Sequence, residues 1–151
     1  MTKFIRFFLV DDDADDTLVF KEILREVNPA IDFHSAADGQ EALSLLKKQS
    51  DNLPDVIFLD LNMPRMDGKE CLKAIKNDMQ LQHIPVIMYT TSSQSKDIEE
   101  TMQKGAICFI TKPTNLKDLK NILTSVSQNV HGSLTRSLRV LSDSSNTFIV
   151  C

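Results

Sequence analysis

Residues 54–68 read PDVIFLDLNMPRMDG, and this stretch decides the fold. A proline precedes the nearly continuous apolar run 55–59, and Asp60 follows that run directly. Such a short apolar run is typical of a strand that is buried on both faces of a parallel sheet. A helical pattern follows over residues 68–78, so we expect a strand and a crossover helix, with Asp60 at the carboxyl end of the strand.

The same arrangement, with polar residues directly after an apolar run, occurs at three other places in the chain. Asp11 and Asp12 follow residues 3–10, Thr90 follows residues 86–89, and Lys112 follows residues 106–111. The carboxyl ends of parallel strands lie along one edge of a sheet, where ligands bind. We therefore expect three carboxylates, one hydroxyl and one ammonium group to converge at this edge.

Apolar runs and amphipathic segments alternate five times along the chain. In the first amphipathic segment, Phe20, Ile23, Leu24 and Val27 recur at the spacing of one helix face. The remaining elements are a strand at 31–36 and helices that begin near Asp38 or span 68–78, 95–104 and 116–126. Strands that alternate with helices form parallel sheets through right-handed crossovers. The predicted fold class is therefore α/β, with a five-stranded parallel sheet and helices on both faces.

The composition is that of an ordinary globular domain. The chain has 151 residues, of which 42% are hydrophobic and 25% charged, and its formal net charge is −4. A nucleic-acid-binding protein needs a clustered basic face, which this charge disfavours. The apolar run 4–10 is too short to span a bilayer, contains Arg6 and lacks a signal-peptide cleavage site. We therefore expect a cytoplasmic protein that contacts neither nucleic acid nor membrane.

Glycines, cysteines and histidines indicate no site of their own. The four glycines lack the spacing of a phosphate-binding loop. Cys71, Cys108 and Cys151 lie far apart, which is the pattern of neither a disulfide framework nor a zinc site, so we expect free thiols. The three histidines are equally scattered, which disfavours a histidine-based metal centre.

Asp11, Asp12 and Asp60 form the expected metal site. Like charges a few ångströms apart repel each other, so three carboxylates at one sheet edge require a cation. Oxygen ligands without a nearby histidine or cysteine favour Mg²⁺ or Mn²⁺ over zinc. Lys112 alone would leave an excess of negative charge, which one divalent cation neutralises.

The acidic run at residues 11–16 also has a plainer interpretation, because negative charge is favourable at a helix N-terminus. We assign this role to Asp15 and Asp16 and leave Asp13 unassigned. Asp11 and Asp12 belong to the metal site because the other three polar signals accompany them.

Asp60 is the expected nucleophile. A carboxylate that attacks phosphorus forms an aspartyl phosphate, and this reaction needs positioning and neutralisation of the phosphoryl oxygens. The metal and Lys112 supply positive charge, while Thr90 supplies a hydroxyl donor. Lys112 or Thr90 alone would be an ordinary side chain, and only its place directly after a buried strand singles it out.

These residues together resemble the receiver domains of bacterial two-component response regulators. The resemblance covers roughly residues 3–128 and implies a flavodoxin-like (βα)5 receiver fold. It implies that Asp60 accepts the phosphoryl group. It also implies that Asp12, Asp60 and the backbone carbonyl of Asn62 bind Mg²⁺, with Asp11 acting through metal-bound water.

The resemblance further implies a switch and its partners. Thr90 and Lys112 sense the phosphoryl group, and Phe109 occupies the place of the family's switch aromatic. Thr90 moves toward the phosphoryl group and Phe109 follows it, which reshapes the surface of the fourth helix, fifth strand and fifth helix. The phosphoryl donor is a histidine kinase or a histidine phosphotransfer protein, and an unknown downstream protein receives the signal without a DNA-binding output domain. Such a protein is not an ordinary enzyme, although it catalyses its own phosphorylation and dephosphorylation.

Two residues depart from the family pattern. Thr91 stands where a small residue is usual, and its β-branched side chain would either narrow access to Asp60 or slow the movement of Thr90. Thr114 stands where a large apolar residue is common. Two other functions compete with that of a phosphorylated receiver domain, namely a receiver-like module that no longer takes phosphate and a metal-dependent phosphohydrolase. The intact acid, threonine and lysine set disfavours the first, and the lack of an insertion long enough for a substrate cap disfavours the second.

Residues 1–130 form the expected domain, and residues 131–151 form a C-terminal tail. The apolar stretches 138–141 and 148–150 flank a polar segment, which predicts a hairpin or a short strand. The tail either folds back on the domain or makes a homodimer or partner contact, because an exposed Phe-Ile-Val-Cys end is unfavourable.

Overall fold

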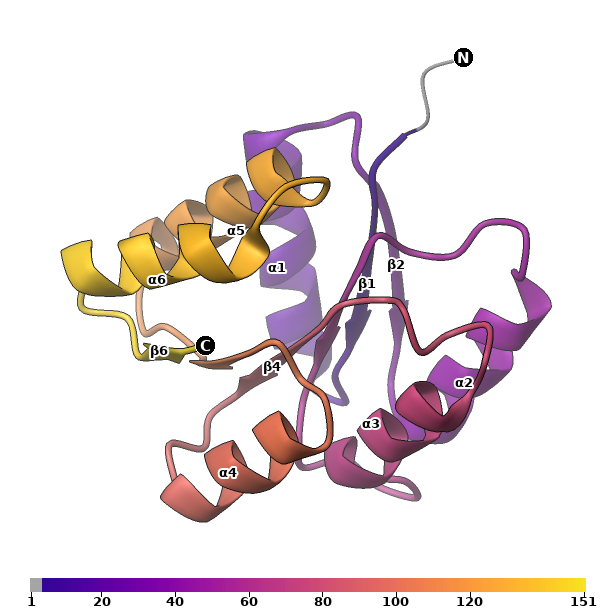
Figure 1. Cartoon of the computed structure of the whole chain (residues 1–151). Coiled ribbons are helices and arrows are strands. Elements are labelled where there is room, and N and C mark those ends of the chain that lie inside the picture. Colours follow the sequence, from indigo (N-terminus) through magenta and orange to yellow (C-terminus); the bar gives the residue numbers. More distant parts are fainter. Residues whose placement is uncertain (1–3) are drawn as a thin grey trace.

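The computed structural model describes residues 4–151 and shows one sheet with helices on both faces (Figure 1). The strands are β1 (Arg6–Val10), β2 (Asp32–Ala36), β3 (Val56–Leu59), β4 (Val86–Thr90), β5 (Cys108–Thr111) and β6 (Ile149–Val150). The helices are α1 (Ala14–Val27), α2 (Gly39–Lys48), α3 (Gly68–Asn77), α4 (Ser95–Gln103), α5 (Leu116–Asn129) and α6 (Leu134–Ser144). Within residues 4–151, no helix is both long and apolar enough to cross a membrane.

The strand order is β2-β1-β3-β4-β5-β6, and strands β1 to β5 are all parallel to one another. The predicted α/β class and parallel arrangement are confirmed. The predicted count of five strands is wrong, because β6 adds to β5 as a sixth, antiparallel strand. A strand of two residues is too short for hydrophobic periodicity to reveal it.

The sheet separates two apolar cores because successive side chains of a strand point to opposite faces. In β1, Phe7 and Leu9 face the core under α1, α5 and α6, whereas Phe8 and Val10 face the core under α2, α3 and α4. Figure 1 shows these two helical layers on either side of the strands. Both faces of the central strands are covered, which explains their nearly continuous apolar sequences.

Polar residues begin and end the helices that flank the site. Asp13, left unassigned from the sequence, is the N-cap of α1, and its side chain accepts a hydrogen bond from the amide of Asp16. Asp38 and Asp67 cap α2 and α3 in the same way. Side-chain caps of this kind satisfy amides that have no partner within the helix. The caps set the points at which the chain leaves each strand end and turns into a helix.

Of the two predictions for the C-terminal tail, the hairpin over residues 138–150 is wrong, whereas the short strand is confirmed at Ile149–Val150. Residues 138–141 lie inside α6, and only Ile149–Val150 is a strand. Ser133 caps α6, and Leu134 and Leu138 lie one turn apart on its buried face against α5. The apolar run 138–141 concealed this helix, because a short run of this kind is typical of strand and helix alike.

The prediction of three free thiols is also wrong for two of them. Cys108 and Cys151 form a disulfide, and Cys71 is free and buried. Phe109 pairs with Val150 across the two antiparallel strands, which places Cys108 opposite Cys151. The two cysteines are 43 residues apart, so only the pairing of β5 with β6 brings them together. Burial raises the pKa of the Cys71 thiol to about 12 and keeps it protonated.

Candidate functional site

Four strands deliver the predicted site residues to the carboxyl end of the sheet. Asp11 and Asp60 directly follow β1 and β3, which are neighbours in register, and the Asp60 amide donates to the carbonyl of Val10 at 2.9 Å. Thr90 ends β4, and Lys112 directly follows β5, the strand beside it. The convergence predicted from the sequence is therefore present in the structure.

The three predicted metal ligands lie together. Asp11, Asp12 and Asp60 each offer a carboxylate oxygen, and these atoms all lie within 4.8 Å of one another. Oxygen ligands of one Mg²⁺ ion lie about 2.0–2.1 Å from it, and therefore up to about 4.2 Å from one another, so oxygens spaced in this way need only small side-chain shifts to share a cation. Asp11 and Asp60 are buried, whereas Asp12 is exposed and leaves the site open to solvent. The arrangement suits an ion that keeps some of its water ligands.

The Lys112 ammonium group lies close to two carboxylates of the metal site, those of Asp11 and Asp60, and to the carboxylate of Asp16. Its Nζ is 2.7 Å from Asp11 Oδ2, 2.8 Å from Asp16 Oδ2 and 3.5 Å from Asp60 Oδ2. It also lies 5.7 Å from the centre of the Tyr89 ring. Burial alone would lower the pKa of Lys112, but the hydrogen bonds to Asp11 and Asp16 and the charge of Asp60 raise it above its ordinary value. Lys112 therefore carries a fixed positive charge.

Asp16 is a member of the cluster that the sequence analysis missed. We assigned it only to the helix N-terminus, and it does lie in the first turn of α1, but its carboxylate also contacts Lys112. Because α1 begins soon after β1 ends, its first turn passes over the carboxyl end of the sheet. The spacing of Asp16, five residues after Asp11, places it in that turn but does not by itself reveal the contact with Lys112.

The two buried carboxylates are held by backbone amides. Asp13 donates its amide to Asp11 Oδ1 at 2.9 Å, and Leu61 donates its amide to Asp60 Oδ1 at 2.7 Å. Burial raises the pKa of Asp11 to about 6, although the hydrogen bond from Lys112 opposes this shift. On Asp60, the hydrogen bond from Leu61 occupies Oδ1, and Oδ2 is the oxygen that faces Lys112.

The loop between Asp60 and α3 turns back tightly beneath Asp60. Gly68 donates its amide to the carbonyl of Leu61 at 2.8 Å. A Cβ atom at Gly68 would lie 2.1 Å from the Asp60 carbonyl oxygen, so no other residue fits there without moving the nucleophile. Asn62 is exposed on this loop, where its backbone carbonyl is the predicted third metal ligand.

An ion pair ties this loop to the start of α2. Arg65 adopts a φ of 65°, which is unusual for a residue other than glycine. Its guanidinium group lies 2.8 Å from Asp38 Oδ2, and Asp38 is almost completely buried. From the sequence, the position of Asp38 predicts only the start of a helix, and its spacing does not indicate this second partner.

The predicted switch residues occupy β4, β5 and the loop after β4. Thr90 is fully buried, and its Oγ1 accepts a long hydrogen bond of 3.4 Å from the Ser92 amide. Phe109 is fully buried in the core under α3 and α4. Thr91 is exposed at the end of β4, so its effect on access to Asp60 remains a prediction. Asp12 lies with Asp11 and Asp60, and the roles of Asp12, Asn62, Thr90 and Phe109 remain predictions.

Sequence comparisons match this chain to one family. A family model described as the response regulator receiver domain matches residues 7–124. The response regulator Rcp1 of Synechocystis sp. is 33% identical over 122 residues, which cover 78% of this chain and 83% of Rcp1. The chemotaxis protein CheY-3 of Vibrio cholerae is 33% identical over 126 residues, which cover 83% of this chain and 94% of CheY-3.

Solved structures show the same similarity. The crystal structure of the phosphorylated cyanobacterial phytochrome response regulator RcpA matches with a TM-score of 0.76 and 34% identity, over 83% of this chain and 93% of that one. The Mn²⁺-bound form of Rcp1 matches with a TM-score of 0.72 and 31% identity, over 82% and 92% of the two chains. The matched family model ends before α6 and β6.

Proposed function

Because the chain belongs to the response regulator receiver domain family, we propose that it is a phosphorylation-dependent switch of a two-component phosphorelay. Asp60 accepts a phosphoryl group from a histidine kinase or a histidine phosphotransfer protein. The observation that carries the proposal is that Asp60 Oδ2 lies 3.5 Å from the Lys112 ammonium group, while Asp60 also offers a carboxylate oxygen within 4.8 Å of oxygens of Asp11 and Asp12. An attacking carboxylate and positive charge for the phosphoryl oxygens are thereby held in one place.

The transfer forms one bond and breaks another. Asp60 Oδ2 attacks phosphorus while Oδ1 stays on the Leu61 amide, so the side chain keeps one orientation during the reaction. The phosphorus–nitrogen bond of the donor histidine breaks, and its electron pair stays on the imidazole. Lys112 neutralises one phosphoryl oxygen, and the Thr90 hydroxyl donates a hydrogen bond to another.

The metal ligands fit Mg²⁺, with Mn²⁺ as an equivalent. Asp11, Asp12, Asp60 and the Asn62 carbonyl would hold the ion, and the Mn²⁺-bound structure of the relative Rcp1 supports this assignment. When bound, the cation supplies charge that stabilises the phosphoryl oxygens in the transition state. The chain's own residues contribute the orientation, because Asp11 is fixed by the Asp13 amide and by Lys112.

The output is a change in a protein-binding surface. Thr90 is released from its long hydrogen bond to Ser92 when it moves toward the phosphoryl group, and Phe109 follows. This displacement alters the surface of α4, β5 and α5, which a downstream protein then contacts. The protein neither turns over a small substrate nor binds nucleic acid, and it acts in the cytoplasm, where phosphoryl donors charged from ATP are found. A homodimer through residues 131–151 is part of the same proposal.

The test is the intact mass of the protein after incubation with Mg²⁺ and acetyl phosphate. We expect one phosphoryl adduct on the wild type and on Asp15→Asn, an exposed aspartate of the first turn of α1, and none on Asp60→Asn. Removal of Mg²⁺ should also remove the adduct. Incorporation at the wild-type level in Asp60→Asn would refute the assignment of the nucleophile. Turnover of a generic phosphate ester would instead identify a phosphohydrolase.

A further inference from the structure

Residues 134–151 cover the outer edge of β5. β6 pairs with β5 in antiparallel orientation, with Phe109 opposite Val150 and Ile110 opposite Ile149. The Thr111 amide extends this pairing by donating to the Phe148 carbonyl at 3.0 Å. The C-terminal segment therefore occupies the backbone groups that β5 would otherwise present at an open sheet edge.

One covalent bond holds the end of this cover. β6 has only two residues, and a pairing this short contributes little stability by itself. Cys151, the residue after β6, is linked by its disulfide to Cys108 at the start of β5. Cys108 is fully buried, whereas Cys151 is partly exposed, so a reagent reaches the bond from the Cys151 side.

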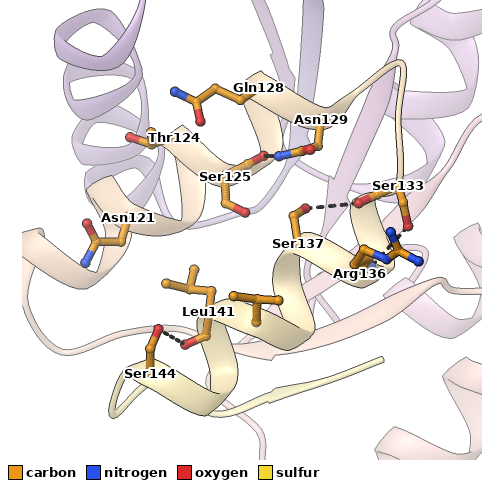
Figure 2. Close-up of a pocket in the computed structure, with 11 residues that line it drawn as sticks. Asn121, Thr124, Ser125, Gln128, Asn129, Ser133, Arg136, Ser137, Leu141 and Ser144 are labelled. Carbon is orange, nitrogen blue, oxygen red and sulfur yellow. Dashed lines mark hydrogen bonds between the residues drawn. The ribbon is translucent and has the colours of Figure 1, made fainter.

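The apolar contacts of the cover lie along one face of α6 and on β6, because Leu134, Leu138 and Ile149 are buried and Leu141 packs against the same core. α5 and α6 pack directly against each other, with Leu134 and Leu138 buried, and a surface groove of about 610 Å³ lies where the two helices meet. Most residues that line it are polar, and Figure 2 shows the hydroxyls of Ser125 and Ser137 between the helices. Because α6 packs on α5 whereas β6 has only two residues, loss of the disulfide is expected to free β6 and its connecting loop before α6.

We propose that the Cys108–Cys151 disulfide is a thiol–disulfide exchange site that latches residues 146–151 onto β5, and that a dithiol reductant opens the latch. Disulfides of cytoplasmic proteins are usually transient, which suits a bond that opens and closes. Cys71 does not compete in this chemistry because it is fully buried in the opposite core.

The exchange proceeds in two balanced steps. A thiolate of the reductant attacks Cys151 Sγ, the sulfur–sulfur bond breaks, and Cys108 leaves as a thiolate that takes up a proton. The second thiolate of the reductant then attacks the mixed disulfide and releases Cys151, which is protonated in turn. Two electrons pass from the dithiol, which becomes a disulfide, to the two protein sulfurs.

The latch lies beside the proposed switch, and its effect on signalling rests on the proposed function. Val150 packs against the same core as Phe109, its partner across the two strands. Thr111, which donates its amide to the cover, also donates its hydroxyl to the Ser92 carbonyl in the loop after β4. The closed latch thus restrains β5 on the side where Phe109 must move, and opening it makes the switch more responsive to phosphorylation.

The test compares hydrogen exchange of the full chain in oxidised and dithiothreitol-reduced form, with Cys151→Ser as a variant that cannot close the latch. In the reduced protein we expect residues 108–111 and 146–151 to exchange faster by about two orders of magnitude, the effect of losing a covalent loop closure. Residues 56–59 of β3 should be unchanged. Cys151→Ser should match the reduced protein in both conditions.

Two results would overturn the latch. One is the absence of a linked Cys108–Cys151 peptide from oxidised protein whose free thiols were blocked before denaturation. The other is equal exchange of residues 108–111 in the oxidised and reduced forms.

A second arm of the experiment tests the coupling to phosphorylation by adding acetyl phosphate and Mg²⁺ to each form. A phosphorylation-dependent change of exchange in α4 and β5 should be at least about threefold larger in the reduced form. Equal changes in the two forms would overturn the coupling, whereas failure of Asp60 to take phosphate would refute the proposed function and leave the first arm decisive for the latch.

Discussion

The carboxyl end of the sheet and the outer edge of β5 are held together in different ways. At the carboxyl end, four strands each deliver a polar residue, and Asp11, Asp16 and Asp60 surround Lys112. At the outer edge, a two-residue strand, two leucines of α6 and one disulfide hold the C-terminal segment. The first region depends on charge and on the register of the whole sheet, whereas the second depends on a short strand pairing, the apolar face of α6 and one covalent bond. We therefore expect charge and Mg²⁺ to govern the first region and thiol reagents to govern the second.

The largest expected effect of a substitution, on both phosphorylation rate and stability, is at Lys112. Lys112→Met leaves the buried Asp11 and Asp60 carboxylates without their cation, so phosphorylation should slow by about 100-fold or more, as for other losses of transition-state charge stabilisation. In the absence of Mg²⁺ the variant should also lose about 2–3 kcal/mol of unfolding free energy, less than the full cost of an unpaired buried charge. Denaturation with and without Mg²⁺ measures this loss, and bound Mg²⁺ should restore part of the unfolding free energy. The exposed Lys117→Met is the control, and equal effects of the two variants would contradict the role of Lys112.

The next effect concerns the C-terminal cover. Leu138 is fully buried between α6 and α5, so Leu138→Ala should cost about 2–3 kcal/mol of unfolding free energy. Val140, on the same helix, is 63% exposed, and Val140→Ala should cost no more than about 0.5 kcal/mol. Urea denaturation of the oxidised proteins measures both values. A cost near zero for Leu138→Ala would mean that α6 is not part of the folded unit.

A smaller effect is expected for the metal site. Asp12→Ala removes one carboxylate ligand, so Mg²⁺ affinity should fall by about 10-fold or more, while the exposed Asp15→Ala should leave it unchanged. Tyr89 is the only tyrosine, the chain has no tryptophan, and the ring lies beside Lys112, so its fluorescence can follow the Mg²⁺ titration. Identical titrations of Asp12→Ala and wild type would refute the ligand role. Reduction of the disulfide should not change the titration, which separates the two regions.

The smallest effect is expected at Thr91. If its side chain narrows access to Asp60, Thr91→Ala should change the phosphorylation or dephosphorylation rate by about two- to fivefold, less than about 1 kcal/mol in barrier height. Thr114→Ala, which lies two residues after Lys112 in the chain, serves as the comparison. The time course of the phosphoryl adduct by mass spectrometry measures both rates, and unchanged rates in Thr91→Ala would dispose of the crowding effect.

The two regions also differ in how much of them the sequence predicted. Asp11, Asp60 and Lys112 each follow a buried apolar strand, and the geometry of a parallel sheet then brings them together. Asp16 was missed because its contact with Lys112 depends on where the first turn of α1 passes, which spacing alone does not reveal. Asp38 and Arg65 were missed for the same reason, since two separate loops must meet before the ion pair exists.

The outer edge was predicted poorly because its structure depends on tertiary contacts. Leu134 and Leu138 have helical spacing, but the run 138–141 is equally compatible with a strand. The pairing of Cys108 with Cys151 follows only from the antiparallel register of β6, a strand too short to leave a pattern. Polar chemistry at strand ends is visible in a sequence, whereas a cover held by one long-range bond is not.

The most direct test of the central claim is to locate the phosphoryl group by chemical trapping. Borohydride reduces an aspartyl phosphate to homoserine, and peptide mass spectrometry then identifies the position that changed. After incubation with Mg²⁺ and acetyl phosphate, we predict homoserine at position 60 alone, in the oxidised and the reduced protein alike. Homoserine at Asp11, Asp12 or Asp16, or none at position 60 in a protein that binds Mg²⁺, would contradict the account.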